Sequence, residues 1–192
     1  ENIKKAVEMT RGEVAVYKGE FVNAWFHSHS GGMTATAKEG LNYKEKEPPY
    51  IQVVKSPDAD AGPEGKRTWS ASFSKEKVAS ILRNKMGQDP GTINSVSIVE
   101  RGPSGRAVTL KIGDATVNAA DFRIQLGSME MRSTLLTSFK VEGNRIVMAG
   151  KGFGHGVGMS QWGAHVMAKQ SKSPEEIVKY YFKDVDRVRL WK

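Results

Sequence analysis

The sequence predicts an α+β fold in which hairpins build a mixed or antiparallel sheet and several helices pack against it. Short segments with alternating apolar and polar residues are joined by glycine-containing turns, as in β-hairpins. Other segments have apolar residues at helical spacing, several of them between a capping Ser or Asn and a closing glycine. Because strands and helices do not alternate strictly, a parallel βαβ architecture is not indicated.

The elements expected from these patterns are spread over the whole chain. Ser74 and Gly87 mark the two ends of one helix, and Ser173-Pro174-Glu175-Glu176 is a capping box that begins another. In chain order, the expected elements are a helix over 3–10, a hairpin over 13–29 with its turn at Lys18-Gly19, a short strand at 50–54, a helix over 75–86, strands at 95–100, 107–112 and 115–117, a helix over 119–126, a hairpin over 139–149, a helix after Met159, a helix over 174–182 and a strand at 185–190.

Length and composition describe a soluble globular protein. The chain has 192 residues, of which 39% are hydrophobic and 26% charged, enough for one domain with a substantial core. We expect residues 1–192 to form a single domain, with a Pro- and charge-rich loop region at 40–67. The absence of cysteine excludes disulfides, thiolate metal sites and cysteine nucleophiles.

The charge balance favours an anionic partner. The net charge is +8 and is spread along the chain without a dense basic block. Nucleic acid, a membrane surface and an acidic polysaccharide are the candidate classes. No basic stripe with interleaved aromatic residues is visible, so we do not expect a nucleic-acid partner.

Residues 150–163, GKGFGHGVGMSQWG, have glycine at every second position up to Gly158. The spacing fits neither a dinucleotide fingerprint nor a Walker A loop nor a nucleophile elbow. If this segment is extended, one of its faces is bare backbone, which suits a flat, hydroxyl-rich ligand such as a sugar that stacks on Trp162. A flexible loop and a close-packed strand crossing are the alternatives left open.

A second motif, HSHSGG at 27–32, places His27 and His29 on one strand face. Hydrogen bonding in a cleft or simple exposure is the expected role of these imidazoles, and we expect no cofactor. Zinc held by His27, His29 and His155 is the alternative. Ser28 and Ser30 lie on the opposite strand face, which argues against a serine nucleophile.

Cleavage of a glycosidic bond requires a carboxylic acid that protonates the leaving oxygen. Glu13 and Glu39 are candidates by position, although neither lies in a distinctive spacing. We expect both to be solvated surface carboxylates.

Three segments resemble the SpoIID/LytB family of cell-wall proteins. They are TRGEVAVYKGEFVNAWFHSHSGGMT at 10–34, MRSTLL at 131–136 and GKGFGHGVGMSQWGA at 150–164. The resemblance spans nearly the whole chain in the right order. It implies a lytic transglycosylase of the sporulation engulfment machinery that cleaves peptide-stripped glycan strands of peptidoglycan and leaves 1,6-anhydro-muramic ends. The alternative within the family is a non-catalytic amidase enhancer that binds the cell wall.

The resemblance also implies partners, a location and binding residues. Expected partners are the glycan strands and stage II sporulation proteins P and M. The expected location is extracytoplasmic, at the septal or engulfing membrane of sporulating cells, with the full-length protein anchored by an N-terminal helix. The predicted substrate-binding residues lie in the two motifs and are His27, Ser28, Ser30, Gly31, Gly32, Gly154, His155, Gly156, Gly158, Ser160, Gln161 and Trp162.

The chain departs from the family pattern in one respect. The family's catalytic glutamate lies in a stretch of the type "EMP…ALKAQAVAARTY", upstream of the region that matches residues 1–30. No such stretch occurs in this sequence. We therefore expect the domain to lack its N-terminal part, and no catalytic role is assigned to Glu8, Glu13 or Glu39.

Overall fold

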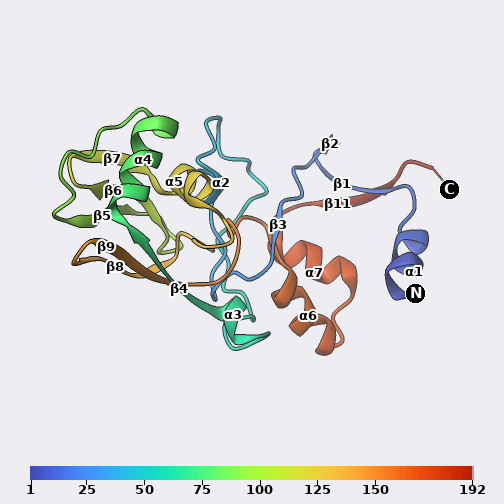
Figure 1. Ribbon diagram of the computed structural model, residues 1–192. Helices are drawn as coiled ribbons and strands as arrows, with labels where there is room; N and C mark the ends of the chain where they lie inside the picture. Colours follow the sequence, from blue (N-terminus) through green and yellow to red (C-terminus); the bar gives the residue numbers. More distant parts are fainter. Residues whose placement is uncertain (192) are drawn as a thin grey trace.

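Two hydrophobic cores organise the computed structural model, which describes residues 1–191 (Figure 1). The first core draws its buried residues from 69–148, and the second from 35–51 and 157–185. We call residues 68–151 the β-rich lobe and the remaining described residues the terminal lobe. The predicted α+β class is confirmed, because helices and mainly antiparallel strands occur in both lobes.

The β-rich lobe contains two antiparallel three-stranded sheets, with strand orders β4-β9-β8 and β5-β6-β7, and two helices. Its elements are β4 (Thr68–Ser74), α4 (Lys75–Met86), β5 (Val96–Arg101), β6 (Ala107–Ile112), β7 (Ala115–Asn118), α5 (Ala119–Leu126), β8 (Leu136–Glu142) and β9 (Arg145–Lys151). Every element in this lobe corresponds to one expected from the sequence, apart from β4, where no strand was expected.

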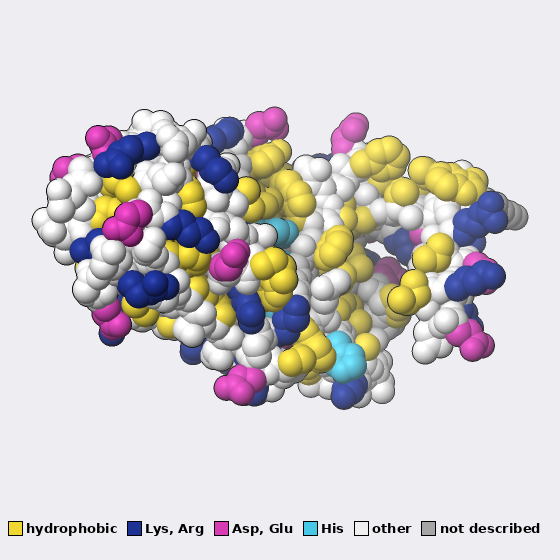
Figure 2. All heavy atoms as spheres, in the orientation of Figure 1, with side chains coloured by type: hydrophobic (Ala, Val, Ile, Leu, Met, Phe, Trp, Pro, Cys, Tyr) yellow, Lys and Arg dark blue, Asp and Glu magenta, His cyan; other side chains and the backbone are white. Residues whose placement is uncertain are grey.

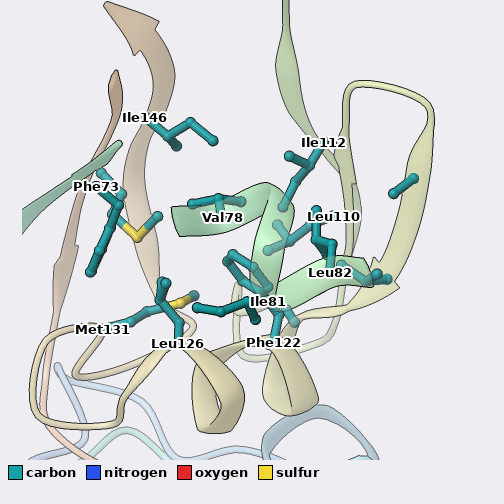
Figure 3. Close-up of a cluster of buried hydrophobic side chains, with 14 of the residues drawn as sticks. Phe73, Val78, Ile81, Leu82, Leu110, Ile112, Phe122, Leu126, Met131 and Ile146 are labelled. Carbon is teal, nitrogen blue, oxygen red and sulfur yellow. The ribbon is translucent and has the colours of Figure 1, made fainter. Parts of the chain in front are cut away.

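Helix α4 forms where its caps predict it. The Ser74 side chain accepts a hydrogen bond from the backbone of Lys77, and Gly87 ends the helix in the left-handed conformation. Its apolar face points into the core between the two sheets, where Leu82 lies near Phe122 of α5 (Figure 3). Burial of this face holds the sheets and helices of the lobe together.

The terminal lobe is built from both ends of the chain (Figure 1). Strand β11 pairs with β1, and β1 with β2, while α6 and α7 pack beside each other. Its elements are α1 (Asn2–Met9), β1 (Glu13–Tyr17), β2 (Glu20–Phe21), β3 (Phe26–His27), α2 (Ala37–Leu41), α3 (Glu64–Arg67), β10 (Met159–Ser160), α6 (Gln161–Lys169), α7 (Pro174–Tyr181) and β11 (Asp186–Arg189). Within residues 1–191, no helix has the length and apolar character needed to cross a bilayer.

Two expectations about local structure are wrong. The second strand of the first hairpin is interrupted, so that β2 and β3 pair with different partners. The strand expected at 50–54 is reduced to one bridge between Ile51 and Phe182. Ile51 is buried in the second core, because tertiary packing of this segment replaces the strand pairing that its apolar residues suggested.

We expect Leu82→Ala to lower the free energy of unfolding by about 2–5 kcal/mol, because it leaves a cavity among fully buried side chains. Urea denaturation followed by circular dichroism measures the change. Val99→Ala is the control, since Val99 is 58% exposed and should change stability by about 0.5 kcal/mol or less. Equal effects of the two substitutions would contradict this description of the core.

Candidate functional site

The two sequence motifs fold against each other although 117 residues, 33–149, lie between them in the chain. Strand β3 pairs in parallel with β10, which places His27 opposite Ser160. Beyond this pair, the backbones of His29 and Phe153 exchange two hydrogen bonds of 3.0 and 2.8 Å. The HSHSGG motif and the glycine-rich segment therefore form one structural unit.

The glycine-rich segment is not extended. Four of its glycines have φ between +71° and +117°, a range that L-residues avoid, so the expected flat ribbon with one bare face does not form. A Cβ on Gly152 would lie 2.7 Å from the His29 carbonyl oxygen, and one on Gly158 would lie 2.1 Å from that of Trp25. The structure shows the close-packed strand crossing, in which missing side chains let two backbones approach each other.

Asp58 joins the two motifs through a fully buried carboxylate. It accepts hydrogen bonds from the Ser30 backbone N–H at 2.7 Å, the Ser30 hydroxyl at 2.6 Å and the Gly32 N–H at 3.2 Å. The Ser160 hydroxyl also donates to Asp58 and accepts from the Gly163 N–H, which caps α6. One carboxylate thus fixes the HSHSGG loop, the end of the glycine-rich segment and the start of α6.

Burial of Asp58 disfavours its ionised form, but the donors around it outweigh this effect. Hydrogen bonds from Ser160 and Ser30 stabilise the carboxylate and hold the pKa of Asp58 below its usual value. Asp58 is therefore an anion at neutral pH and can keep all of its hydrogen bonds.

His29 is fully buried and both of its ring nitrogens are engaged. Nδ1 accepts a hydrogen bond from the Gly31 N–H at 3.0 Å, so Nε2 carries the proton and donates to the Ala61 carbonyl oxygen at 3.1 Å. This neutral imidazole connects the HSHSGG loop to the loop that follows Asp58. It has no free nitrogen with which to bind a metal ion.

His27 and His155 lie edge to face, with ring centroids 5.7 Å apart. Burial and then the charge of Arg106 lower the pKa of His27 to about 3, and burial and then Arg123 lower that of His155 to about 4. Both imidazoles are therefore neutral at pH 7. The zinc alternative required these two residues together with His29, and residues 1–191 contain no group of three or more His, Cys, Asp or Glu side chains arranged to hold a metal.

Arg106 reaches from the β-rich lobe into the HSHSGG loop. Its fully buried guanidinium donates to the carbonyl oxygens of Ser30 at 2.6 Å and Met33 at 2.8 Å. Gly156 lies directly against it, since a Cβ on Gly156 would be 2.4 Å from the Arg106 Cζ. A buried cation with no ion-pair partner within 4 Å among the described residues thus couples the two lobes at the site.

The expectation of solvated carboxylates at Glu13 and Glu39 is wrong. Glu39 is 2% exposed; one of its oxygens accepts the Ser104 N–H and hydroxyl, and the other accepts the Thr36 N–H. Hydrogen bonding from Arg189, opposed by desolvation and aided by Arg187, lowers the pKa of Glu13. Both groups hold elements together, and neither is placed as a free proton donor.

The predicted binding residues divide into two sets by exposure. The first set is buried and makes contacts within the fold: His27, Ser30, Gly156, Gly158 and Ser160. The second set reaches the surface to some degree: Ser28, Gly31, Gly32, Gly154, His155, Gln161 and Trp162. The structure brings all of them into one region, and the surface set is where a ligand can make contact.

A pocket of about 310 Å³ opens beside Gly31. Arg67, at the end of α3, and Lys151, at the end of β9, line it together with Asp60 and Glu64. The Arg67 carbonyl oxygen accepts the Gly152 N–H at 2.8 Å, which fixes α3 to the glycine-rich segment. The pocket therefore belongs to the same unit as the two motifs.

Sequence reasoning missed Asp58, Arg67 and Arg106 as parts of this site. Asp58 stands in SPDADAGP, a stretch with the composition of a surface loop, and Arg106 follows an ordinary turn. No local sequence pattern marks Asp58 or Arg106 as a site residue, because their partners come from distant segments. For Arg67 the net positive charge was the only indication, whereas Lys151 lies within the glycine-rich motif but was not singled out.

Comparisons with known proteins find one matching family model and several similar proteins. A protein-family model described as "Domain of unknown function (DUF8618)" matches residues 41–158. The chain is 36% identical over 97% of its length to stage II sporulation protein D of Bacillus amyloliquefaciens, and 35% identical over 97% to an uncharacterized protein of Brachyspira hyodysenteriae. It is 27% identical over 94% to an amidase enhancer of Bacillus subtilis. The chain spans 52%, 49% and 32% of these relatives, respectively.

We expect Asp58→Asn to lower the free energy of unfolding at pH 7 by about 2–3 kcal/mol, because an amide cannot accept all four hydrogen bonds. The pKa of Asp58 is lower in the folded than in the unfolded protein, so its contribution is present above the unfolded pKa of about 3.9. The contribution is lost as the pH falls through the folded pKa. Urea denaturation between pH 2 and pH 7 measures it.

The exposed neighbour Asp60 supplies the control for this substitution. Asp60→Asn should leave the free energy of unfolding within about 0.5 kcal/mol of the wild type at every pH. A difference between wild type and Asp58→Asn that stayed constant down to pH 2 would contradict the role of the ionised carboxylate.

The packing of the glycine-rich segment predicts that Gly156→Ala strongly lowers the free energy of unfolding. Gly156 and Gly143 both have positive φ, but Gly143 has no neighbouring atom within 4 Å of a Cβ. Gly143→Ala should therefore cost only the strain of the left-handed conformation, about 1–2 kcal/mol. Gly156→Ala should cost about 1–3 kcal/mol more, because its methyl group overlaps Arg106. Similar costs in chemical denaturation would show that the segment is not close-packed.

Proposed function

Because the chain belongs to the SpoIID/LytB family, we propose that it is the glycan-binding scaffold of a peptidoglycan lytic transglycosylase that acts in sporulation. The observation that supports this most directly is the folding of both motifs into one unit, with half-buried polar side chains and backbone beside a charged pocket. Sugars need such a surface, because their hydroxyl groups exchange hydrogen bonds with backbone and neutral side chains.

In the proposed reaction, a carboxylic acid protonates the glycosidic oxygen, and the C6 hydroxyl of the same muramic residue attacks C1. The glycosidic bond breaks and the leaving sugar keeps the proton from the acid. The C6 hydroxyl gives its own proton to the resulting carboxylate, which regenerates the acid, and a 1,6-anhydro ring forms without water. The residues described here bind and orient the strand. Neutral His155 offers a polar group, and the half-buried Trp162, which packs on Gly62, offers aromatic surface on which a sugar ring can stack.

We propose that the acid comes from outside residues 1–192. Glu39 uses its carboxylate within the fold, and Glu13 is paired with two arginines that favour its ionised form. A general acid must instead hold its proton until the bond breaks, which needs a raised pKa. A separate segment that closes over the motif unit would supply this group.

The alternative function is a non-catalytic amidase enhancer that binds the wall and stimulates another enzyme. The similarity to a protein named amidase enhancer favours it.

The proposed partners in the sporulation setting are peptide-stripped glycan strands and the sporulation proteins P and M. An extracytoplasmic location follows from the proposed substrate, which lies outside the cytoplasmic membrane.

A digestion experiment separates the two functions. We expect residues 1–192 alone to release no anhydro-muramic fragments from purified peptide-free glycan strands, and the full-length protein to release them. Mass spectrometry of the soluble products provides the measurement. Anhydro products from residues 1–192 would place the acid within this chain. A full-length protein that is inert on strands but accelerates a purified amidase would establish the enhancer function instead.

A further inference from the structure

The pocket beside Gly31 contains two cations that the protein does not neutralise. Arg67 and Lys151 line the pocket with Asp60 and Glu64, yet among residues 1–191 neither cation has a carboxylate within 4 Å. The Arg67 side chain is half-buried and that of Lys151 is exposed, so both can be reached from the pocket. The buried Arg67 Nε atom has no hydrogen-bond acceptor among residues 1–191, so the hydrogen-bonding capacity of this guanidinium is not used up within the fold.

Both cationic side chains line the same pocket, and close backbone contacts hold its wall. Thr68 is paired with Lys151 across β4 and β9, which brings the backbone of Arg67 beside that of Lys151. The Gly152 N–H donates to the Arg67 carbonyl oxygen, and a Cβ on Gly31 would lie 3.1 Å from the Lys151 carbonyl carbon. The pocket wall is therefore fixed backbone, while the charged ends of the two side chains remain available to a ligand.

The surroundings of the pocket add positive charge. The Lys66 ammonium lies 4.1 Å from the centre of the Phe153 ring, and the Arg132 guanidinium lies 5.7 Å from it. In Figure 2, Lys and Arg side chains gather near the middle of the visible face, between the two lobes. Lys66 belongs to α3 and Arg132 donates a hydrogen bond to the Gly65 carbonyl oxygen of the same helix, so both add positive charge beside the helix that lines the pocket. This excess of cations favours an anionic ligand.

We propose that Arg67 and Lys151 form a subsite for the free carboxylate of an acidic sugar in the glycan strand. The inference rests on the proposed function, in which the strand carries muramic residues. Removal of the stem peptide converts the lactyl amide of such a residue into a carboxylate, which a guanidinium and an ammonium bind strongly. The neutral amide of a peptide-bearing residue lacks this charge.

The two acidic residues of the pocket add discrimination against the peptide-bearing form. Asp60 and Glu64 lie on the exposed rim of the same pocket. A stem peptide with its own carboxylates would meet these negative charges as it passed over the rim, which weakens binding of the wrong substrate. The arrangement therefore selects one carboxylate held close to the ring and rejects longer acidic groups.

Binding of three probes to residues 1–192 tests the subsite by isothermal titration calorimetry. The probes are a peptide-free GlcNAc–MurNAc tetrasaccharide with free lactyl carboxylates, the same tetrasaccharide with methylamide groups, and a chitin tetrasaccharide without lactyl groups. We expect the carboxylate form to bind at least about tenfold more tightly than the other two. A hydrogen bond between charged groups contributes more binding free energy than one between neutral groups. The preference should weaken with added salt.

Arg67→Met and Lys151→Met should each remove most of this preference and leave binding of the chitin tetrasaccharide unchanged. Lys111→Met is the matched control, since Lys111 is an exposed lysine on β6 outside the pocket. Glu64→Gln should raise affinity for a peptide-bearing strand. Thermal denaturation checks that each variant is folded.

Two results would overturn the proposal, and they differ in what they say about the function. If wild type binds all three tetrasaccharides equally and the variants match it, the carboxylate subsite is wrong and the glycan-binding function stands. If wild type binds none of them, the proposed function fails together with the subsite.

Discussion

The buried carboxylate of Asp58 is the interaction on which the rest of the site depends. A charge without solvent is costly, and here four hydrogen-bond donors from two distant segments compensate it. Those donors belong to the HSHSGG loop and to the N-terminus of α6. The carboxylate therefore determines where these segments meet, and the surface formed by the motifs follows from its position.

A second constraint is steric. The glycine-rich segment can cross the HSHSGG loop only because its backbone carries no side chains at the contact points, and Gly156 leaves room for the Arg106 guanidinium. Arg106 then connects the β-rich lobe to the same loop. Burial and the nearby arginines keep His27 and His155 neutral near pH 7.

These constraints give most of the motif residues a structural role and not a catalytic one. Most of the distinctive polar residues of the motifs are used to hold backbone in place, and the parts that reach solvent are glycine backbone, Gln161, Trp162, His155 and the pocket cations. A surface of this kind suits binding and orientation of a strand. It also explains why neither Glu13 nor Glu39 is available as an acid, since both carboxylates are already committed to other segments.

The sequence by itself determined the α+β class, most helix and strand positions in the β-rich lobe and the two motifs that form the site. These features depend on local signals such as the Ser74 cap, the Gly87 stop and the alternation of strands, which act over a few residues. Only the tertiary structure decided the backbone path of the glycine-rich segment, the burial of Asp58 and Glu39, and the meeting of Arg67 with Lys151. Their partners lie up to about 130 residues away, and no local pattern encodes a contact at that separation.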